Sequence, residues 1–320
     1  GYVIIAIATV VFALLGYKYL VRLNTYIVYA MYLLALLSIV ALSGSFDASY
    51  AGAPDMYALG TFWPTWILAV LTCGAAGPIS VVTQTGDWTR YVSGAAKKSD
   101  VVRSAFWAMS IGLAVPTLFG AFIAVAAFDE NSFVAGYVKE SPTWLLIPLL
   151  LVGFVGSLGQ GSVNLYSMGL DMDAILPRLS RLQSTLVVSG VATGLVFIGK
   201  FVYDAEAAVT NACLFLTALG TAWIAIALFG YFRMGGTFHK EDLQVFNKRK
   251  EGGIYWYQAG WSIKATVAWI VASISGILGI SSVDYTGPIA NALGGVDVSV
   301  IAPAIVGIAI YWIWDLVEAK

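Results

Sequence analysis

Apolar runs long enough to cross a membrane repeat from one end of this 320-residue chain to the other. These runs do not alternate polar with apolar residues, so they predict helices and not the strands of a membrane barrel. Lipid tolerates a segment only when its backbone polar groups are paired internally, which a helix achieves by itself. Charged residues make up 11% of the chain, whereas a soluble domain has roughly 25%. The sequence therefore predicts an all-α polytopic membrane protein.

Hydropathy and loop charge together predict how many spans there are and which way they run. With Gly1 placed outside, fifteen of the 17 basic residues fall on the inner side, and only Lys139 and Lys200 fall outside. Inner enrichment of Lys and Arg is the rule for multi-pass proteins. We therefore expect one transmembrane domain over residues 1–320, in the plasma membrane, with a cytoplasmic C-terminus. The predicted spans are nine, at about 2–20, 24–43, 62–85, 103–127, 143–169, 182–199, 206–232, 262–281 and 298–316.

Two features at the ends and in the loops shape the expected organisation. The chain opens on Gly1 without Met or a basic signal region. An odd number of spans then leads us to expect that the natural protein continues upstream by an odd number of helices. The longest inner loop, residues 233–261, is rich in glycine and charge and indicates a hinge or gate connection.

Several functional classes find no support in the sequence. Cys73 and Cys213 both fall inside apolar spans, which favours packing over a disulfide. The sole histidine, His239, lies in a polar loop, so no metal-ligand spacing is present. The sequence contains no basic run with interleaved aromatic residues, the pattern that would indicate a nucleic-acid partner. The apolar spans offer amides and hydroxyls but neither histidine nor paired acids, so we do not expect an enzyme.

The third span predicts a broken helix. Gly77 and Pro78 fall near the middle of the membrane, and Ser80 begins a polar stretch that is still at membrane depth. Proline lacks an N–H and clashes with the carbonyl four residues earlier. A helix broken in lipid leaves backbone groups that are tolerated only beside a cavity or a ligand. We therefore predict Gly77, Pro78 and Ser80 in a binding site; a plain proline kink with packed hydroxyls is the alternative.

Three further polar residues are candidates for gating. Asp87 and Arg90 lie three residues apart at the inner end of the third span, a spacing that allows a helical ion pair. The pair predicts either an inner gate latch or a simple interfacial anchor. Asn211, near the outer end of the seventh span, is a candidate for an outer gate.

The fifth span carries a polar stripe within an arc of about 80° on a helix. Its residues are Ser157, Gln160, Asn164, Ser167 and Asp171. Carboxamides are costly inside a membrane unless they are paired. Two amides one turn apart offer donors and acceptors that suit the hydrogen-bonding edge of a flat heterocycle. We predict Gln160 and Asn164 as ligand-binding residues, with helix–helix contact through small and polar residues as the alternative.

Four segments, taken in order, resemble the nucleobase–cation symporter-1 family, which includes cytosine, purine, allantoin and hydantoin permeases. The run Gly86–Tyr91 resembles the signature after that family's sixth helix, and the other three resemble the end of its eighth helix and the starts of its eleventh and twelfth. These three are Asn164–Leu170 with Pro177 and Arg178, Gly253–Trp261, and Gly295–Ser299.

The resemblance implies helices four to twelve of a twelve-helix transporter with a LeuT-like inverted-repeat fold, truncated at its N-terminus. It implies a secondary active transporter that imports a nucleobase, such as cytosine or a purine, or a related heterocycle by alternating access with a cation. Gly77 and Pro78 then correspond to the break in the sixth helix. Asn164 corresponds to an amide that bonds the substrate, and Gln160 to another amide one turn earlier.

The resemblance also bears on the coupling ion. Sodium-coupled members carry two hydroxyl residues just before the position of Gln160, where this chain has Leu158 and Gly159. The substitution favours a proton over sodium and leaves Ser157 and Asp171 as candidate coupling-ion residues; capping at the membrane interface is the alternative role for Asp171. No cofactor is expected. The same fold carrying an amino acid or a vitamin precursor, or a channel, are the alternative functions.

Overall fold

The computed structural model describes residues 2–50, 57, 59–82, 84–127, 133–176, 178–201, 205–245 and 250–318. Within these ranges the regular structure is helical, with two isolated β-bridges besides. All nine predicted spans are helices, and seven of them are long and apolar enough to cross a membrane. The remaining two, Val3–Leu15 and Ile263–Leu278, are shorter apolar helices. The predicted all-α membrane class is confirmed.

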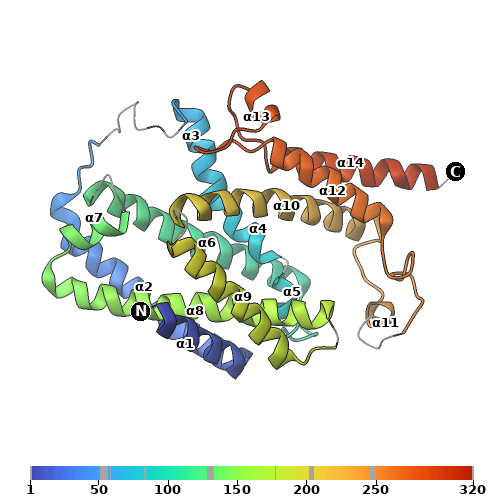
Figure 1. Cartoon of the computed structure of the whole chain (residues 1–320), viewed down its shortest axis with the longest axis horizontal. Helices are drawn as coiled ribbons and strands as arrows, with labels where there is room; N and C mark the ends of the chain where they lie inside the picture. The colour runs from blue at the N-terminus through green and yellow to red at the C-terminus, as the bar shows by residue number, and fades with distance from the viewer. Residues whose placement is uncertain are drawn as a thin grey trace. The chain divides into compact units, whose positions relative to one another are not determined.

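The helices form two compact units that interleave along the chain, and each is described by itself. The first unit covers Gly1–Ala51 and Ala95–Tyr203, and the second covers Gly52–Gly94 and Asp204–Lys320. Figure 1 labels the helices of both. The first contains α1 (Tyr2–Leu15), α2 (Tyr17–Leu42), η1 (Ser43–Ser45), α6 (Lys98–Ala126), α7 (Phe133–Glu140), α8 (Thr143–Ile175) and α9 (Arg181–Phe201). The second contains α3 (Phe62–Ala69), η3 (Val70–Ala75), α4 (Ala76–Val82), α5 (Thr85–Thr89), α10 (Ala205–Arg233), α11 (Lys240–Leu243), α12 (Ile263–Leu278), α13 (Pro288–Ala292) and α14 (Ile301–Glu318).

One boundary differs clearly from the sequence prediction. The first helix ends at Leu15 and the next begins at Tyr17, so Lys18 and Arg22 lie inside α2 and not in a loop. The turn is made by Gly16, whose φ of 92° is open to glycine and strained for other residues. Hydropathy did not reveal this turn because apolar residues precede Gly16 and mostly apolar and aromatic residues follow it, with Lys18 among them.

Helix α8 is the centre of the first unit, with α1, α2 and α9 packed around it. Glycines on three of its faces let the neighbouring helices approach closely. A β-carbon added at each of these glycines would clash with the side chain facing it, namely Ile27 of α2 at Gly159, Thr9 of α1 at Gly161, and Thr185 of α9 at Gly169. The small residues of this segment therefore act in helix packing, as membrane helices require in the absence of a hydrophobic driving force between them.

In the second unit α10, α12 and α14 form a close three-helix body. A β-carbon on Gly276 of α12 would lie 2.9 Å from Ala218 of α10 and 3.0 Å from Pro303 of α14. In the middle of α10, the indole N–H of Trp269 donates to the carbonyl of Leu219 at 3.1 Å. These contacts hold the three helices close together around Gly276 and Trp269.

Replacing Gly169 with Val is expected to destabilise the protein by about 1–3 kcal/mol, because the new side chain overpacks the contact with Thr185. Gly153→Val, on the same helix, is the matched control, since nothing lies within 4 Å of the β-carbon position at Gly153. Thermal unfolding of the two variants in detergent measures the difference. Equal melting temperatures would show that the α8–α9 contact is not tight.

Candidate functional site

The predicted break at Pro78 does not occur, and this expectation is corrected. Residues 62–82 form one continuous helical segment in which η3 is a π-helix. The N–H of Ala76 donates to the carbonyl of Leu71, five residues earlier. The π turn ends at Ala75, three residues before Pro78, and it includes Gly74, whose carbonyl is four residues before the proline. A wider turn at that carbonyl relieves the clash that a proline inside a helix otherwise makes.

The π-helical turn still marks this segment as special, because single π turns occur frequently at functional sites. Gly77 and Pro78 are half-buried, and Ser80 is exposed. The hydroxyl of Ser80 donates to the carbonyl of Gly77 at 2.8 Å. In the same unit, Ile79 packs onto Gly220, so α4 lies against the middle of α10.

The polar stripe on α8 is exposed at both ends and buried between them. Ser157 and Gln160 are exposed, Asn164 is half-buried, and Ser167 is fully buried. The side-chain amide of Gln160 donates to Oδ1 of Asn164 at 3.5 Å, a long and weak hydrogen bond. Asp171, exposed near the end of α8, completes the stripe.

A cavity of about 290 Å³ lies between α1, α8 and α9 of the first unit. Its polar lining consists of uncharged groups, from Thr9, Ser157, Asn164, Ser189 and Thr193. Two residues predicted from the sequence, Ser157 and Asn164, thus line one cavity. Gln160 joins it through its contact with Asn164.

The gating candidates lie in the second unit. Arg90 donates from Nη2 to the hydroxyl of Tyr91 at 3.0 Å and lies over the ring of that residue. Asp87 is in the first turn of α5. The Asp87–Arg90 latch stays a prediction.

Asn211 ties the N-terminal part of α10 to the loop between α12 and α14. Its Nδ2 donates to Asp284 at 2.9 Å, and its Oδ1 accepts from the hydroxyl of Ser282 at 3.2 Å. These contacts make Asn211 an anchor within one unit, while its role at an outer gate stays a prediction.

Asp297 organises the same loop, a role that the sequence did not reveal. The side chain is 4% exposed and accepts from the backbone N–H of Ser281 at 2.7 Å and of Ser299 at 2.8 Å. It joins the end of α12 to the start of α14. Its position beside Ser299 in a loop between two spans was the available signal, because acidic side chains often accept from backbone N–H groups in turns.

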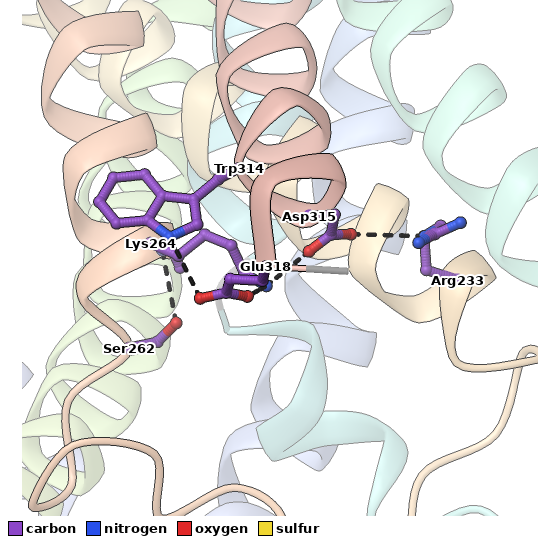
Figure 2. Close-up of polar contacts among 7 residues, drawn as sticks. Arg233, Ser262, Lys264, Trp314, Asp315 and Glu318 are labelled. Atoms are coloured by element: carbon purple, nitrogen blue, oxygen red, sulfur yellow. Dashed lines mark hydrogen bonds and ion pairs between the residues drawn. The ribbon is translucent and has the colours of Figure 1, made fainter. Parts of the chain in front are cut away.

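A second group that the sequence did not predict joins the other ends of these helices (Figure 2). Asp315 of α14 pairs with Lys264 of α12 at 2.5 Å and with Arg233 of α10 at 3.4 Å. Lys264 also pairs with Glu318 at 3.0 Å, and Glu318 accepts from the indole N–H of Trp314 at 3.1 Å. The predicted spans place these residues near one another's ends, but the sequence does not show which of them pair.

A family model described as permease for cytosine/purines, uracil, thiamine, allantoin matches residues 1–301 of the chain. The chain belongs to this permease family. No curated protein and no solved structure matches it. The match confirms the family resemblance read from the sequence, and it makes the chain a multi-pass membrane transporter of small heterocycles rather than an enzyme.

The structure brings together some of the predicted site residues of this permease and not others. Ser157, Gln160 and Asn164 lie together on α8 in the first unit, and Asp171 lies further along that helix. The remaining predicted residues, Gly77, Pro78, Ser80, Asp87, Arg90 and Asn211, belong to the second unit. A site combining both sets stays a prediction.

Asp297→Ala is expected to destabilise the permease by at least about 2 kcal/mol, because two backbone N–H groups lose their acceptor in a buried place. Asp297→Asn keeps one acceptor oxygen and should fall between the variant and the parent. Thermal unfolding in detergent measures both. A melting temperature for Asp297→Ala that equals the parent's would contradict the assigned role.

Proposed function

We propose that this permease is a cation symporter that imports a nucleobase or a closely related neutral heterocycle by alternating access in a LeuT-like fold. The observation that carries the proposal is the cavity beside α8, whose polar lining, among the described residues, combines the amide of Asn164 with hydroxyls and no charged group. Its volume, about 290 Å³, is near the lower end of the range of small-molecule sites, about 300–1,000 Å³.

The chemistry of the two amides supports a heterocyclic ligand. Each carboxamide carries a carbonyl acceptor and an N–H₂ donor, and the edge of a nucleobase offers acceptors and donors side by side. The contact between Gln160 and Asn164 is long, at 3.5 Å, so a ligand displaces it at small cost. In this proposal Asn164 bonds the ring edge directly and Gln160 completes the pairing.

The uncharged lining also discriminates among the alternatives. An amino acid carries a carboxylate and an ammonium group, and burial of a charge requires a partner of opposite sign. Thiamine, named in the family description, carries a permanent positive charge, and among the described lining residues the aromatic ring of Phe197 is available to face that charge without a carboxylate. The described lining offers no charged partner, which favours a neutral ring.

The surroundings of Gly159 support a proton as the coupling ion. The β-carbon position of Gly159 lies 2.6 Å from Cδ1 of Ile27 and 2.8 Å from Oδ1 of Asn24. An apolar methyl and a single amide oxygen occupy this space, whereas a hard cation requires several oxygen ligands. We propose Asp171 as the proton acceptor. The hydroxyl of Ser157, which donates to the carbonyl of Gly153 at 2.8 Å, retains acceptor capacity toward the cavity.

The proposed setting is the plasma membrane, with Gly1 outside and the C-terminus in the cytoplasm. It rests on the strong bias of Lys and Arg to one side of the predicted spans.

Asn164→Ala in the full-length permease is expected to lower uptake of its heterocycle at least tenfold, because the ring edge loses its main hydrogen-bonding partner, worth about 1.5 kcal/mol or more. Uptake of labelled cytosine or adenine into cells or proteoliposomes is the measurement. Asn291→Ala, at an exposed position far along the chain, is the control for changes in expression. Unchanged uptake by Asn164→Ala at normal membrane levels would refute the assignment of the site.

Ligand stabilisation is expected to be independent of sodium. A thermal-shift screen of the full-length permease against nucleobases, run in sodium and in choline buffers, should give the same shift in both. The physical reason is that the space beside Gly159 is filled by side chains of α2. A shift that requires sodium would overturn proton coupling while leaving the substrate class intact.

A further inference from the structure

We propose that the ion pair between Arg233 and Asp315 is a releasable latch at the predicted inner end of α10, and that Lys264 positions and neutralises Asp315 so that the latch can open. The inference rests on the transport cycle proposed above. It adds to that cycle a contact that breaks and reforms.

The two cations hold Asp315 unequally (Figure 2). Nζ of Lys264 lies 2.5 Å from Oδ1, and the side chains of Lys264 and Asp315 are 17% and 14% exposed. Nε of Arg233 lies 3.4 Å from Oδ2, and the Arg233 side chain is 55% exposed. A short, largely buried pair is held firmly, whereas a long and exposed pair contributes little and is screened by salt. The Arg233 side of the cluster is therefore the one that opens.

The Lys264 side is fixed by the packing of α12 on α14. The β-carbon position of Gly307 lies 3.3 Å from the side chain of Ala272, and that of Gly276 lies 3.0 Å from Pro303. Lys264 stands in the first turn of α12 and Asp315 near the last turn of α14. Each charge is disfavoured by the dipole of its own helix, so each depends on the other across the antiparallel pair.

The end of α10 that carries Arg233 lies between two flexible points. Gly230 is one turn earlier, and its β-carbon position has only the hydroxyl of Tyr311 nearby, at 3.8 Å. Gly235 and Gly236 follow the helix with φ values of 74° and 70°. Glycine within a helix weakens it, and consecutive glycines after it absorb changes of direction. The last turn of α10 can therefore move while the rest of the helix stays packed.

This last turn carries part of the inner loop with it. The ring of Tyr231 lies 5.3 Å from that of Phe238, which lies 6.2 Å from that of Tyr255. The hydroxyl of the buried Tyr255 accepts from the backbone N–H of His239 at 3.0 Å. A movement of the last turn of α10 therefore carries with it the aromatic cluster of Tyr231, Phe238 and Tyr255 and the start of the loop after α10.

Lys264 makes the release possible. A buried carboxylate that loses its partner is strongly destabilising. When Arg233 moves into solvent, Asp315 keeps its bond to Lys264, and the exposed guanidinium is solvated by water. No buried charge is left unpaired in either position. One carboxylate with a permanent and a removable cation is the arrangement that a reversible latch requires.

A reversible crosslink tests the latch directly. Arg233→Cys and Asp315→Cys are combined in a background with Cys73→Ala and Cys213→Ala, and joined with a short bismaleimide containing a reducible disulfide. Crosslinking is expected to lower the initial rate of nucleobase uptake at least tenfold, and dithiothreitol is expected to restore it. Ala272→Cys with Gly307→Cys, joined by a direct disulfide across the fixed α12–α14 contact, where the β-carbon positions lie 3.3 Å apart, is the control that should keep its uptake.

The outcomes separate this inference from the proposed function. Full uptake by the crosslinked Arg233–Asp315 pair overturns the latch. Failure of the cysteine-free parent to take up any heterocycle overturns the proposed function instead.

A second measurement tests the latch if the double-cysteine variant does not fold. Arg233→Gln is expected to raise KM about two- to fivefold with kcat unchanged or higher, because weakening the inner closure lowers the population that binds substrate from outside. Lys264→Met is expected to lower the amount of folded protein, since Asp315 keeps only its exposed partner. An unchanged KM for Arg233→Gln contradicts the latch.

Discussion

The structure of this permease depends on one constraint: a backbone polar group surrounded by lipid must form its hydrogen bond within the chain. The helices satisfy it along their length, and side-chain hydroxyls satisfy it again by donating back to their own helix. Thr72 bonds Leu68 in this way at 2.8 Å, and Thr217 bonds Cys213 at 2.6 Å. The same constraint explains why the segment around Pro78 widens into a π turn and does not break.

Packing within the first unit depends on glycines of α8, whose lack of a side chain lets the neighbouring helices approach. Where Gly159, Gly161 and Gly169 meet their neighbours, α8 lies against three helices at once, and little room remains there. The cavity beside Asn164 lies between α1, α8 and α9, among side chains that fill this space less completely. Helix α8 therefore packs tightly against its neighbours at the three glycines and less tightly elsewhere. The less tightly packed part leaves the cavity beside the amide of Asn164.

The sequence predicted the helices well and their local distortions poorly. Each of the nine spans that hydropathy and charge predicted is helical in the described part of the chain, because long apolar runs have few alternatives in lipid. The turn at Gly16 and the π turn before Pro78 depend on backbone geometry, which hydropathy does not measure. On α8, residue spacing predicted that Gln160 and Asn164 share one face. The bonds of Asp297 and Asp315 depend on which helix ends meet in space, and single-residue chemistry could not identify their partners.

Cys73 gives the π turn a practical consequence. It is an exposed thiol inside η3, and the chain has only one other cysteine, Cys213, which is less exposed. Replacement of Cys213 would leave Cys73 as the labelling position in this chain. A fluorophore or spin label attached there would sit on the π-helical part of the segment, where the hydrogen bonding departs from the α-helical pattern. The permease thus carries a built-in reporter position for following how this segment rearranges while a molecule crosses the membrane.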